Sequence, residues 1–309
     1  MNVIVVGSGA REHALCRILH KSYLCEKVFC FPGNYGISQI AECKDISTKE
    51  DIVEECIKIN PDLVVVGPEN YLSENLAGEL RNKGLNVFGP DSEGAKLESS
   101  KEFMKEFCQS HNIPTAKSQT FVDFDEAKDY LESFSGPIVV KYDGLAAGKG
   151  VFVCTNTNEA INACERIFIK KEFNQENNKV VIEEFIEGKE LSFFTITDGN
   201  EYLNIGSAQD YKRVGNNDTG PNTGGMGTIS PAPILDNNLD MIIQDQIVKK
   251  TIEGLKHDNI AFQGVIFFGI IVNEHNQPYL LEYNTRSVSY THLRAHETRG
   301  NLVCRLLLE

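Results

Sequence analysis

The first third of the chain alternates short apolar runs with segments of helical spacing. Four runs, each followed by glycine or proline, have the β-branched character of buried parallel strands. Between them apolar residues recur at helical spacing, and Ser47 is the expected N-cap of one helix. This alternation predicts an α/β fold with a doubly wound parallel sheet, in which ligands bind beyond the carboxyl ends of the strands. The expected strands are residues 2–6, 27–31, 62–66 and 86–88, and the expected helices include residues 48–59 and 73–82.

The remainder of the chain has helices and strands that frame several glycine-rich stretches. The stretch over residues 207–227 is rich in glycine and charge and too long for an ordinary turn, so we expect a structured binding loop there. The expected helices are residues 99–111, 124–133 and 239–257, and the expected strands are residues 137–142, 179–183, 264–272 and 278–284.

Composition narrows the class of protein. At roughly 150 residues per domain, 309 residues predict two or three domains. The net charge of −14 argues against a nucleic-acid or membrane-surface binder, because both partners are polyanionic. We see no signal peptide and no apolar run of the roughly 18 residues that cross a bilayer. Nine scattered cysteines without a C-x-x-C pair predict thiols in a reducing compartment, so we expect a cytoplasmic protein.

The glycine turn in GSGAREHA leads into the first expected helix. A dinucleotide site is disfavoured, because Glu12 stands where G-x-G-x-x-G needs its third glycine, and the second strand ends at Phe31 without an acid for a ribose. A helix N-terminus with free N–H groups can still bind a phosphate, and Arg11 could add a bidentate contact. A tight turn that only closes the fold is the alternative, and this segment does not separate the two.

A strand, a glycine loop and a second strand follow one another in KYDGLAAGKGVFV, residues 141–153. This is not a Walker A loop, because Gly148 and Lys149 are followed by Gly150 and an apolar run. A glycine hairpin can lie over triphosphate oxygens with its N–H groups turned inward, and it can open and close. Lys141, at the end of the first strand, could reach phosphate oxygens. An ordinary flexible hairpin with solvated lysines is the alternative.

Two further strands end in candidate ligands. The run over residues 183–186 could present backbone groups to an adenine edge, and Glu190 could accept hydrogen bonds from ribose hydroxyls. Glu282 and Asn284 are two residues apart in PYLLEYN, which places both side chains on one face of a strand. Two such oxygen ligands suit Mg²⁺, which shares its shell with substrate phosphates. Taken alone, E-x-N is equally explained by a polar strand end.

Together these segments resemble the ATP-grasp ligases, and among them the phosphoribosylamine–glycine ligase (glycinamide ribonucleotide synthetase) family of purine biosynthesis. The matching stretches GSGAREHA, PGN, VVGPE, SSK, VVKYDGLAAGKGV, VIEEFIEG, SAQDYKRVGNNDTGPNTGGMG and LLEYNTR occur in family order. The resemblance implies that the carboxylate of glycine attacks the γ-phosphoryl group of ATP to give glycyl phosphate. The amine of 5-phosphoribosylamine then displaces phosphate and forms glycinamide ribonucleotide.

By motif position the resemblance also implies ATP with Mg²⁺ or Mn²⁺ as cofactors, small-molecule substrates, no nucleic-acid or membrane partner, and a monomer. The implied catalytic residues are Lys141, Asp210 and Arg286. The implied ATP-binding residues are Lys101, Lys141, Gly144, Gly148, Lys149, Gly150, Glu183, Glu184, Phe185, Ile186 and Glu190; the implied substrate-binding residues are Gly9, Arg11, Asn34, Lys212, Thr223, Gly224 and Gly225; and the implied metal ligands are Glu282 and Asn284.

The resemblance divides the chain into four parts. An N-terminal Rossmann-like substrate domain is expected over residues 1–115, and an ATP-grasp small lobe with a glycine-rich lid over residues 116–189. A large lobe, expected to be partial, covers residues 190–286. The tail over residues 287–309 contains three Arg but neither Lys nor Asp, unlike the body of the chain. It also lacks the phenylalanine and Gly-Asp-Pro-Glu segment of the family, so we expect a foreign end on a truncated chain.

Three alternatives accompany this interpretation. The chain could be another ATP-grasp carboxylate–amine ligase, which the stretch over residues 207–227 would discriminate, because the second substrate should be read there. It could be a nucleotide-binding but inactive fragment, since the family pattern stops after Arg286. A Rossmann oxidoreductase is disfavoured by Glu12 and Phe31.

Overall fold

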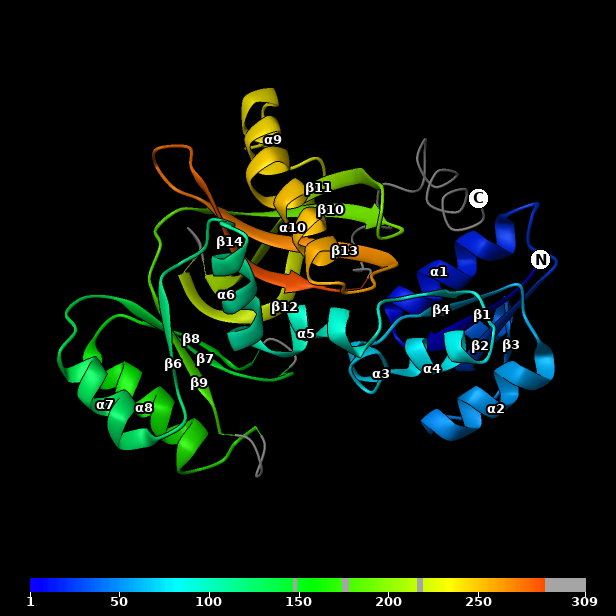
Figure 1. The fold of residues 1–309 in the computed structure, drawn as a ribbon, viewed down its shortest axis with the longest axis horizontal. Coiled ribbons are helices and arrows are strands. Elements are labelled where there is room, and N and C mark those ends of the chain that lie inside the picture. The colour runs from blue at the N-terminus through cyan, green and yellow to red at the C-terminus, as the bar shows by residue number, and fades with distance from the viewer. Residues whose placement is uncertain (147–148, 174–177, 216–218, 287–309) are drawn as a thin grey trace.

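The computed structural model describes residues 1–146, 149–173, 178–215 and 219–286 of the chain. In this part of the chain the strands form three sheets, one parallel and two antiparallel (Figure 1). The predicted α/β class, with a doubly wound parallel sheet followed by two α+β lobes, is confirmed. Of the helices described, none is both long and apolar enough to cross a membrane.

The N-terminal sheet has the strand order β3-β2-β1-β4-β5, and its strand pairs are parallel. Alternate residues of β1 enter different cores: Ile4 and Val6 pack with α2 and α4, whereas Val3 and Val5 pack with α1. Helices therefore cover both faces of the sheet, as its continuous apolar strands predict. The elements are β1 Asn2–Gly7, α1 Ala10–Lys21, β2 Lys27–Pro32, the 3₁₀ turn η1 Ile37–Gln39, β3 Glu42–Cys43, α2 Lys49–Ile59, β4 Leu63–Val66, α3 Glu69–Ser73, α4 Leu76–Asn82 and β5 Val87–Phe88.

Two predictions about these helices are wrong in detail. Thr48, not Ser47, is the N-cap of α2, because its side chain accepts a hydrogen bond from the backbone N–H of Asp51. The single helix predicted over residues 73–82 is instead two helices, α3 and α4. Asn75 separates them with a left-handed φ of 64°, which an α-helix cannot continue through.

Two helices connect the N-terminal sheet to the rest of the chain. The helix predicted over residues 99–111 is shorter, because Ser100 caps α6 by accepting a hydrogen bond from the N–H of Phe103. The helix α5 before it was not predicted, and it lies between the N-terminal domain and the two lobes (Figure 1). These helices are α5 Ser92–Ser99 and α6 Lys101–Ser110.

The four-stranded antiparallel sheet, which we call the small lobe, has the order β6-β9-β7-β8. Helices α7 and α8 lie together against it (Figure 1), and one core joins Leu131 of α7, Ile167 of α8 and Val140 of β7. The antiparallel pair β7 and β8 frames the predicted glycine loop, with Lys141 opposite Val151. The elements are β6 Ser118–Phe121, α7 Phe124–Glu132, β7 Ile138–Tyr142, β8 Val151–Cys154, α8 Thr157–Phe168 and β9 Val180–Glu184.

The second antiparallel sheet, the large lobe, has the order β12-β11-β10-β13-β14. A loop predicted over residues 207–227 is instead a long hairpin of β11 and β12, in which Gln209 pairs with Ile229 and Asp210 with Thr228. Cross-strand hydrogen bonds satisfy the backbone of this polar segment, which carries no apolar alternation that would have signalled a strand. The strands are β10 Lys189–Thr197, β11 Tyr202–Gly215, β12 Thr219–Ile229, β13 Gly264–Val272 and β14 Pro278–Asn284.

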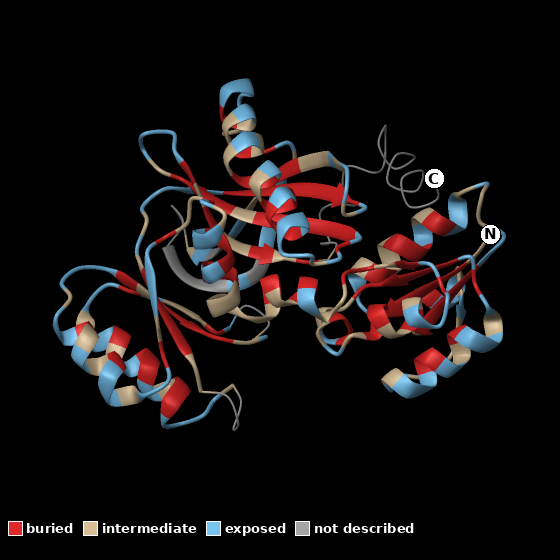
Figure 2. Ribbon diagram, in the orientation of Figure 1, coloured by how far each residue is buried: buried red, intermediate tan, exposed pale blue. Residues whose placement is uncertain are grey.

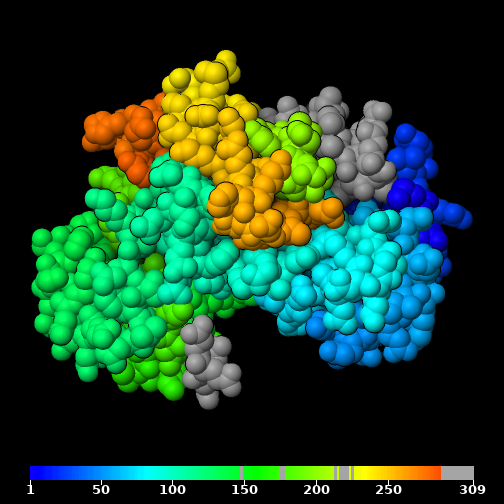
Figure 3. Space-filling view, in the orientation of Figure 1, coloured from blue at the N-terminus to red at the C-terminus, as the bar shows by residue number. Residues whose placement is uncertain are grey.

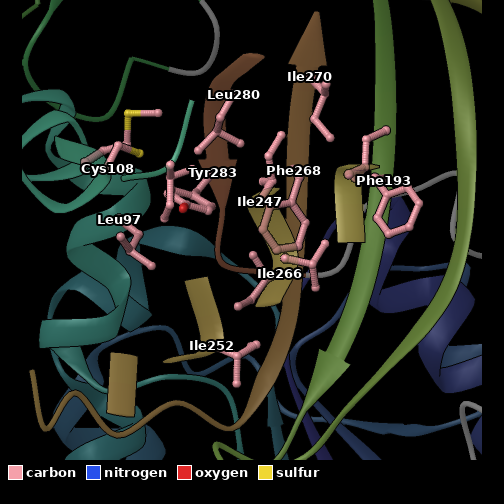
Figure 4. Packing of buried hydrophobic residues seen from close by; sticks show 14 of the residues in the cluster. Leu97, Cys108, Phe193, Ile247, Ile252, Ile266, Phe268, Ile270, Leu280 and Tyr283 are labelled. Carbon is pink, nitrogen blue, oxygen red and sulfur yellow. The ribbon is translucent and has the colours of Figure 1, made fainter. Parts of the chain in front are cut away.

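One hydrophobic core joins the large lobe to α6 and to a continuous helical segment near residues 237–257. Tyr283 of β14 is fully buried there beside Phe268 and Ile247 (Figure 4), and its hydroxyl lies 2.8 Å from Thr251 Oγ1. The helix predicted over residues 239–257 is interrupted by one π-helical turn. The segment consists of α9 Asn237–Ile243, η2 Gln244–Val248 and α10 Lys249–His257.

Buried residues concentrate in the strands of all three sheets, while the outward helix faces are exposed (Figure 2). The N-terminal domain and the small lobe lie at opposite ends of the molecule, and α5 and α6 lie between them (Figure 1). The space-filling view is hollowed along one edge between these two masses (Figure 3). Side-chain contacts that join the small lobe, the large lobe and the two connecting helices involve α5, α6, β7, β9 and β14.

Candidate active site

A buried carboxylate lies between two lysines where the small lobe meets the large lobe. Glu183 of β9 places Oε1 2.9 Å from Nζ of Lys141 on β7, and Oε2 3.0 Å from Nζ of Lys105 on α6. The exposed fraction is 2% for Glu183 and 7% for each lysine, and burial lowers the pKa of Lys105. Lys141 also donates to the carbonyl of Leu281 on β14 at 3.0 Å. The ammonium group of Lys141 is thereby fixed at the junction of β7, β9 and β14.

The N-terminus of α6 holds a third lysine. The buried carboxylate of Asp143 accepts hydrogen bonds from the backbone N–H groups of Lys101 and, at 3.2 Å, Glu102. These groups would otherwise lack partners at a helix start. The side chain of Lys101 donates to the carbonyls of Glu98 and Gly144, both at 3.1 Å. The first turn of α6 is therefore hydrogen-bonded both to the end of α5 and to the start of the glycine loop.

Glu282 and Asn284 lie on one face of β14, on either side of buried Tyr283. Burial lowers the pKa of Lys101, and the negative charge of Glu282 opposes that shift, so the two side chains are within electrostatic reach. The Nδ2 atom of Asn284 is buried and has no hydrogen-bond partner among the described residues. A buried donor without a partner fits an anionic oxygen, and a carboxylate beside it fits a divalent cation.

The described part of the glycine loop packs around Tyr142. A Cβ atom at Gly144 would lie 2.5 Å from Cε1 of the Tyr142 ring, and one at Gly150 would lie 3.1 Å from its Cβ. The N–H of Tyr142 donates to the carbonyl of Gly150 at 2.8 Å, which closes the loop at its base. Lys149 is exposed, and its N–H donates to the carbonyl of Ala146. The Tyr142 ring thus leaves no room for a side chain at Gly144, and the Cβ atoms of Ala146 and Tyr142 crowd Gly150.

A row of alternating charges joins the N-terminal domain to the end of β14. Arg286 Nε lies 2.9 Å from Glu98 Oε1 and 2.8 Å from Glu69 Oε2, and the same oxygen of Glu69 lies 3.6 Å from Arg11 Nη1. Glu98 Oε2 accepts a hydrogen bond from the N–H of Thr285 at 2.7 Å. Burial raises the pKa of Glu98, which the charge of Arg286 opposes; burial and that same charge lower the pKa of Arg11. Arg11 and Arg286, assigned to different substrates from the sequence, therefore share one carboxylate.

Glu12 fills the glycine turn at the start of α1. The N–H of Gly9 donates to Glu12 Oε2 at 2.6 Å. A Cβ atom at Gly7 would lie 2.6 Å from Glu12 Cγ, and one at Gly67 would lie 2.2 Å from Glu12 Oε1. Arg11 Nη1 donates to the carbonyl of Gly67 at 2.8 Å. A buried carboxylate thus occupies the turn that a dinucleotide fingerprint leaves open for pyrophosphate, which gives a physical reason for the sequence-based exclusion.

The segment predicted to meet adenine follows β9 directly. Glu183 turns inward to the two lysines, whereas the carboxylate of Glu184 accepts a hydrogen bond from a backbone N–H just before β6. Phe185 has an exposed fraction of 37%, and Ile186 is half-buried. Glu190 is exposed near the start of β10. The side chain of Glu183 is therefore engaged with lysines, and its backbone pairs with β6 and β7.

The predicted substrate residues lie in two places. Asn34 donates to the carbonyl of Ser8 at 2.7 Å and accepts from the N–H of Ile37, which ties it to the glycine turn beside Arg11. Asp210 lies on β11, and Thr223 is exposed on β12. The prediction at Gly148 lies outside the described residues. The surroundings of Lys212, Gly224 and Gly225 are not described either.

The structure brings Lys101, Lys141, Glu282 and Arg286 together from three elements far apart in sequence. Their partners were missed, since a buried charge looks like any surface charge in a sequence. Asp143 had a local signal, because it opens the glycine loop. The missed residues are Glu69, Glu98, Lys105 and Asp143.

A parallel-sheet domain followed by two antiparallel lobes, with lysines at their junction, is the domain order of the ATP-grasp class. Comparison with known proteins gives a more specific result. Residues 1–98 match the family model described as phosphoribosylglycinamide synthetase, N domain, and residues 99–289 match phosphoribosylglycinamide synthetase, ATP-grasp (A) domain. The chain belongs to the phosphoribosylglycinamide synthetase family.

Curated relatives agree with this family. A chloroplastic phosphoribosylamine–glycine ligase of Arabidopsis thaliana is 46% identical over 282 residues, which cover 89% of this chain and 53% of the relative. A phosphoribosylamine–glycine ligase of Brucella melitensis is 44% identical over 288 residues, covering 93% of this chain and 67% of the relative. The chain therefore spans about half the length of the plant relative and two thirds of the bacterial one.

Solved structures agree as well. The crystal structure of a phosphoribosylamine–glycine ligase from Thermotoga maritima superposes with a TM-score of 0.85 at 31% identity, covering 100% of this chain and 75% of that one. A biotin carboxylase domain from Hydrogenobacter thermophilus, solved with ADP and magnesium, has a TM-score of 0.72 at 19% identity and covers 93% of this chain and 64% of that one. The second likeness supports the fold alone.

Proposed function

We propose that this chain carries the site for ATP-dependent ligation of glycine to 5-phosphoribosylamine, giving glycinamide ribonucleotide, ADP and phosphate. Family membership supports the reaction. The observation that carries it is the convergence of Lys101, Lys141, Glu282 and Arg286 at the ends of α5, α6, β7 and β14. Two ammonium groups, a guanidinium and a carboxylate at one place fit a triphosphate with a divalent cation.

In this proposal ATP lies between the two lobes. Lys101 and Lys141 hold phosphate oxygens, and the backbone N–H groups of residues 144–150 cover them as a lid. The backbone of residues 183–186 meets the adenine edge, and Glu190 accepts hydrogen bonds from the ribose. Pairing with Glu183 and the Leu281 carbonyl keeps the ammonium group of Lys141 in place before ATP binds, so little ordering is lost on binding.

A divalent cation is the second component. Glu282 supplies a carboxylate and Asn284 an amide oxygen, both hard ligands on one face of β14. We assign Mg²⁺, with Mn²⁺ as a substitute, because both accept oxygen ligands and phosphates in one shell. When bound, the cation would neutralise phosphate charge during phosphoryl transfer. The unpartnered Nδ2 of Asn284 would donate to a phosphate oxygen.

The chemistry then needs positioning and charge rather than a covalent enzyme intermediate. A carboxylate oxygen of glycine attacks the γ-phosphorus and ADP leaves; the amine of phosphoribosylamine then attacks the acyl carbon and phosphate leaves. Arg286 stabilises the transferring phosphoryl group, while Glu69 and Glu98 hold its guanidinium in place. We assign the phosphoribosylamine side to Gly9, Arg11 and Asn34. The placement of glycine and of the ribosyl substrate is assigned to Asp210, Lys212, Thr223, Gly224 and Gly225.

We further propose a division into a substrate domain, a small lobe and a large lobe, acting as a monomer in the cytoplasm. The sequence places the first boundary near residue 115. Packing supports an earlier one, because Leu97, Met104 and Phe107 belong to the core of the large lobe. Matching of the N-domain model over residues 1–98 supports the same position.

An assay of ADP release that depends on both glycine and phosphoribosylamine tests the function. It should compare this chain with a chimaera in which residues 287–309 are replaced by the corresponding C-terminal part of the Thermotoga maritima enzyme. We expect turnover at least in the chimaera, with glycinamide ribonucleotide as product. Turnover in neither protein, despite bound ATP, would overturn the ligase assignment. Tight NADH binding without ATP binding would overturn the ATP-grasp site itself.

A further inference from the structure

Three metal-ligating side chains converge at a place that the proposed reaction does not use. His111 is the C-cap of α6, His257 is the last residue of α10, and Asp258 is the C-cap of α10. Asp258 lies between the two rings: its Oδ2 is 2.8 Å from His111 Nε2, and its Oδ1 is 2.9 Å from His257 Nδ1. One ligand atom from each residue lies within 4.8 Å of the others.

This cluster lies at the opposite end of α6 from the lysine that begins the helix. The ten residues of α6 span about 15 Å, at about 1.5 Å of rise per residue. Lys101 and Asp143 belong to the N-terminal end of this helix, and His111 to its C-terminal end. A ligand at the cluster would therefore be separate from ATP and its cation.

The ends of two helices favour a positive charge here. Both α6 and α10 finish at the cluster, and the free carbonyl groups of a helix C-terminus carry partial negative charge. The nearby lysines are engaged elsewhere, since Lys250 donates to the carbonyl of Asn112 and Lys256 to that of Asn200.

Packing fixes the orientation of one ring and leaves the other adjustable. The His111 ring lies against the Phe107 ring at a tilt of 54°, with ring centroids 4.6 Å apart, and a Cβ atom at Gly254 would lie 2.8 Å from the His111 ring. The ring is thus held between α6 and α10 with Nε2 toward Asp258. His257 has a side chain 80% exposed and meets His111 edge-on at 5.6 Å, so it can close on a ligand at little cost.

We propose that His111, His257 and Asp258 form a binding site for one transition-metal cation of the Zn²⁺ class. Two imidazole nitrogens and one carboxylate oxygen are ligands of these cations, and water would complete the shell. When the cation is bound, each neutral ring offers it the nitrogen that faces Asp258 and carries its single proton on the other nitrogen. Ligand atoms around tetrahedral Zn²⁺ are about 3.3 Å apart with bonds of about 2.0 Å. Here one ligand atom from each residue lies within 4.8 Å of the others, so the side chains reach this geometry by adjusting around the cation.

The chain offers a matched control. His275 is another exposed histidine, with a side chain 76% exposed, and its Nε2 lies 3.6 Å from Glu274 Oε1. It has one carboxylate neighbour but belongs to no described three-ligand cluster. Replacing either His257 or His275 with alanine removes one exposed imidazole, but only the change at His257 should abolish metal binding at the proposed site.

Zn²⁺ titration of the full chain without nucleotide, followed by calorimetry and thermal unfolding, tests the proposal. We expect one site in the parent protein and in His275→Ala, and at least about tenfold weaker binding in His257→Ala and Asp258→Asn. At 100-fold excess over the Kd, the unfolding temperature should rise by on the order of 4 °C in the first two proteins only. Equal binding by the parent and His257→Ala would overturn the proposal.

Co²⁺ provides a second readout that does not depend on stability. It should give a visible absorption spectrum of nitrogen and oxygen coordination, which Asp258→Asn and His257→Ala lose. A thiolate charge-transfer band at the first equivalent would assign the binding to cysteines instead, and would also overturn the proposal. Mg²⁺ should produce neither signal, because imidazole is a poor ligand for it.

Discussion

The ammonium group of Lys141 lies 2.9 Å from the carboxylate of Glu183, which at the same time holds Lys105 at 3.0 Å. The two lysines are equally buried but differ in their other partners. Lys141 donates to the carbonyl of Leu281 on β14, whereas Lys105 donates to Thr115 and Ala116. One lysine is therefore directed toward the proposed phosphate site, and the other anchors α6.

This difference gives a paired prediction. Lys141→Met and Lys105→Met each remove one partner of a buried carboxylate that keeps the other lysine, so each should lower the free energy of unfolding by about 1–3 kcal/mol. Only Lys141→Met should also reduce ATP-dependent turnover by about 100-fold or more. Urea unfolding and ADP release on the active chimaera measure the two effects. Equal loss of turnover in both variants would remove the distinction, and normal turnover of Lys141→Met would exclude Lys141 from the site.

Arg286 is held by two carboxylates through one nitrogen, which a lysine cannot reproduce in the same geometry. We expect Arg286→Lys to lower kcat by about 100- to 1,000-fold with little change in the Kd for ATP, because the group acts on the transferring phosphoryl. Steady-state kinetics and nucleotide binding measure this split. Arg166→Lys, which changes an exposed arginine paired with Glu172, is the control and should leave both values unchanged. A loss of ATP affinity without loss of kcat would contradict the assigned role.

Glu98 predicts a pH dependence of stability. Burial raises its pKa above that of an unfolded glutamate, about 4.3, so the native state binds more protons between the two values. Its contribution to stability is therefore complete below the unfolded pKa and is lost as pH rises through the folded pKa. Glu98→Gln should remove this downward slope when the free energy of unfolding is measured across that range. Glu93→Gln, on the exposed face of the same helix, should keep it; identical slopes in all three proteins would refute the prediction.

Glu12 predicts a local stability effect. Its carboxylate accepts the N–H of Gly9 and fills the space beside Gly7 and Gly67. Glu12→Ala should lower the free energy of unfolding by about 1–3 kcal/mol, because the N–H of Gly9 at the start of α1 loses its partner and the space that the buried side chain fills is emptied. Denaturant unfolding against Glu26→Ala, an exposed change just before β2, measures the difference. A cost no larger than that of the control would mean that water replaces the carboxylate.

Much of the fold follows from local pattern. The strands β1, β2 and β4 are continuous apolar runs that end at glycine or proline, and their burial on both faces leaves one arrangement, a parallel sheet between helices. The hairpin β11–β12 could not be predicted in this way, because its residues are polar and glycine-rich. Its strands form because they pair with each other and with β10 at the sheet edge.

In the candidate site, too, some features follow from the sequence and others only from the tertiary structure. Sequence by itself determined the apolar strands, the glycine loop around Tyr142, and the presence of Lys141, Glu282 and Arg286 in motifs with a chemical meaning. Only the tertiary structure decided the partners, because those pairs join residues far apart in the chain: Glu98 meets Arg286 across a separation of 188 residues. Exposed ion pairs contribute little to stability, whereas burial holds the paired groups in one geometry. Burial is a property of the packed fold, so the sequence does not reveal it.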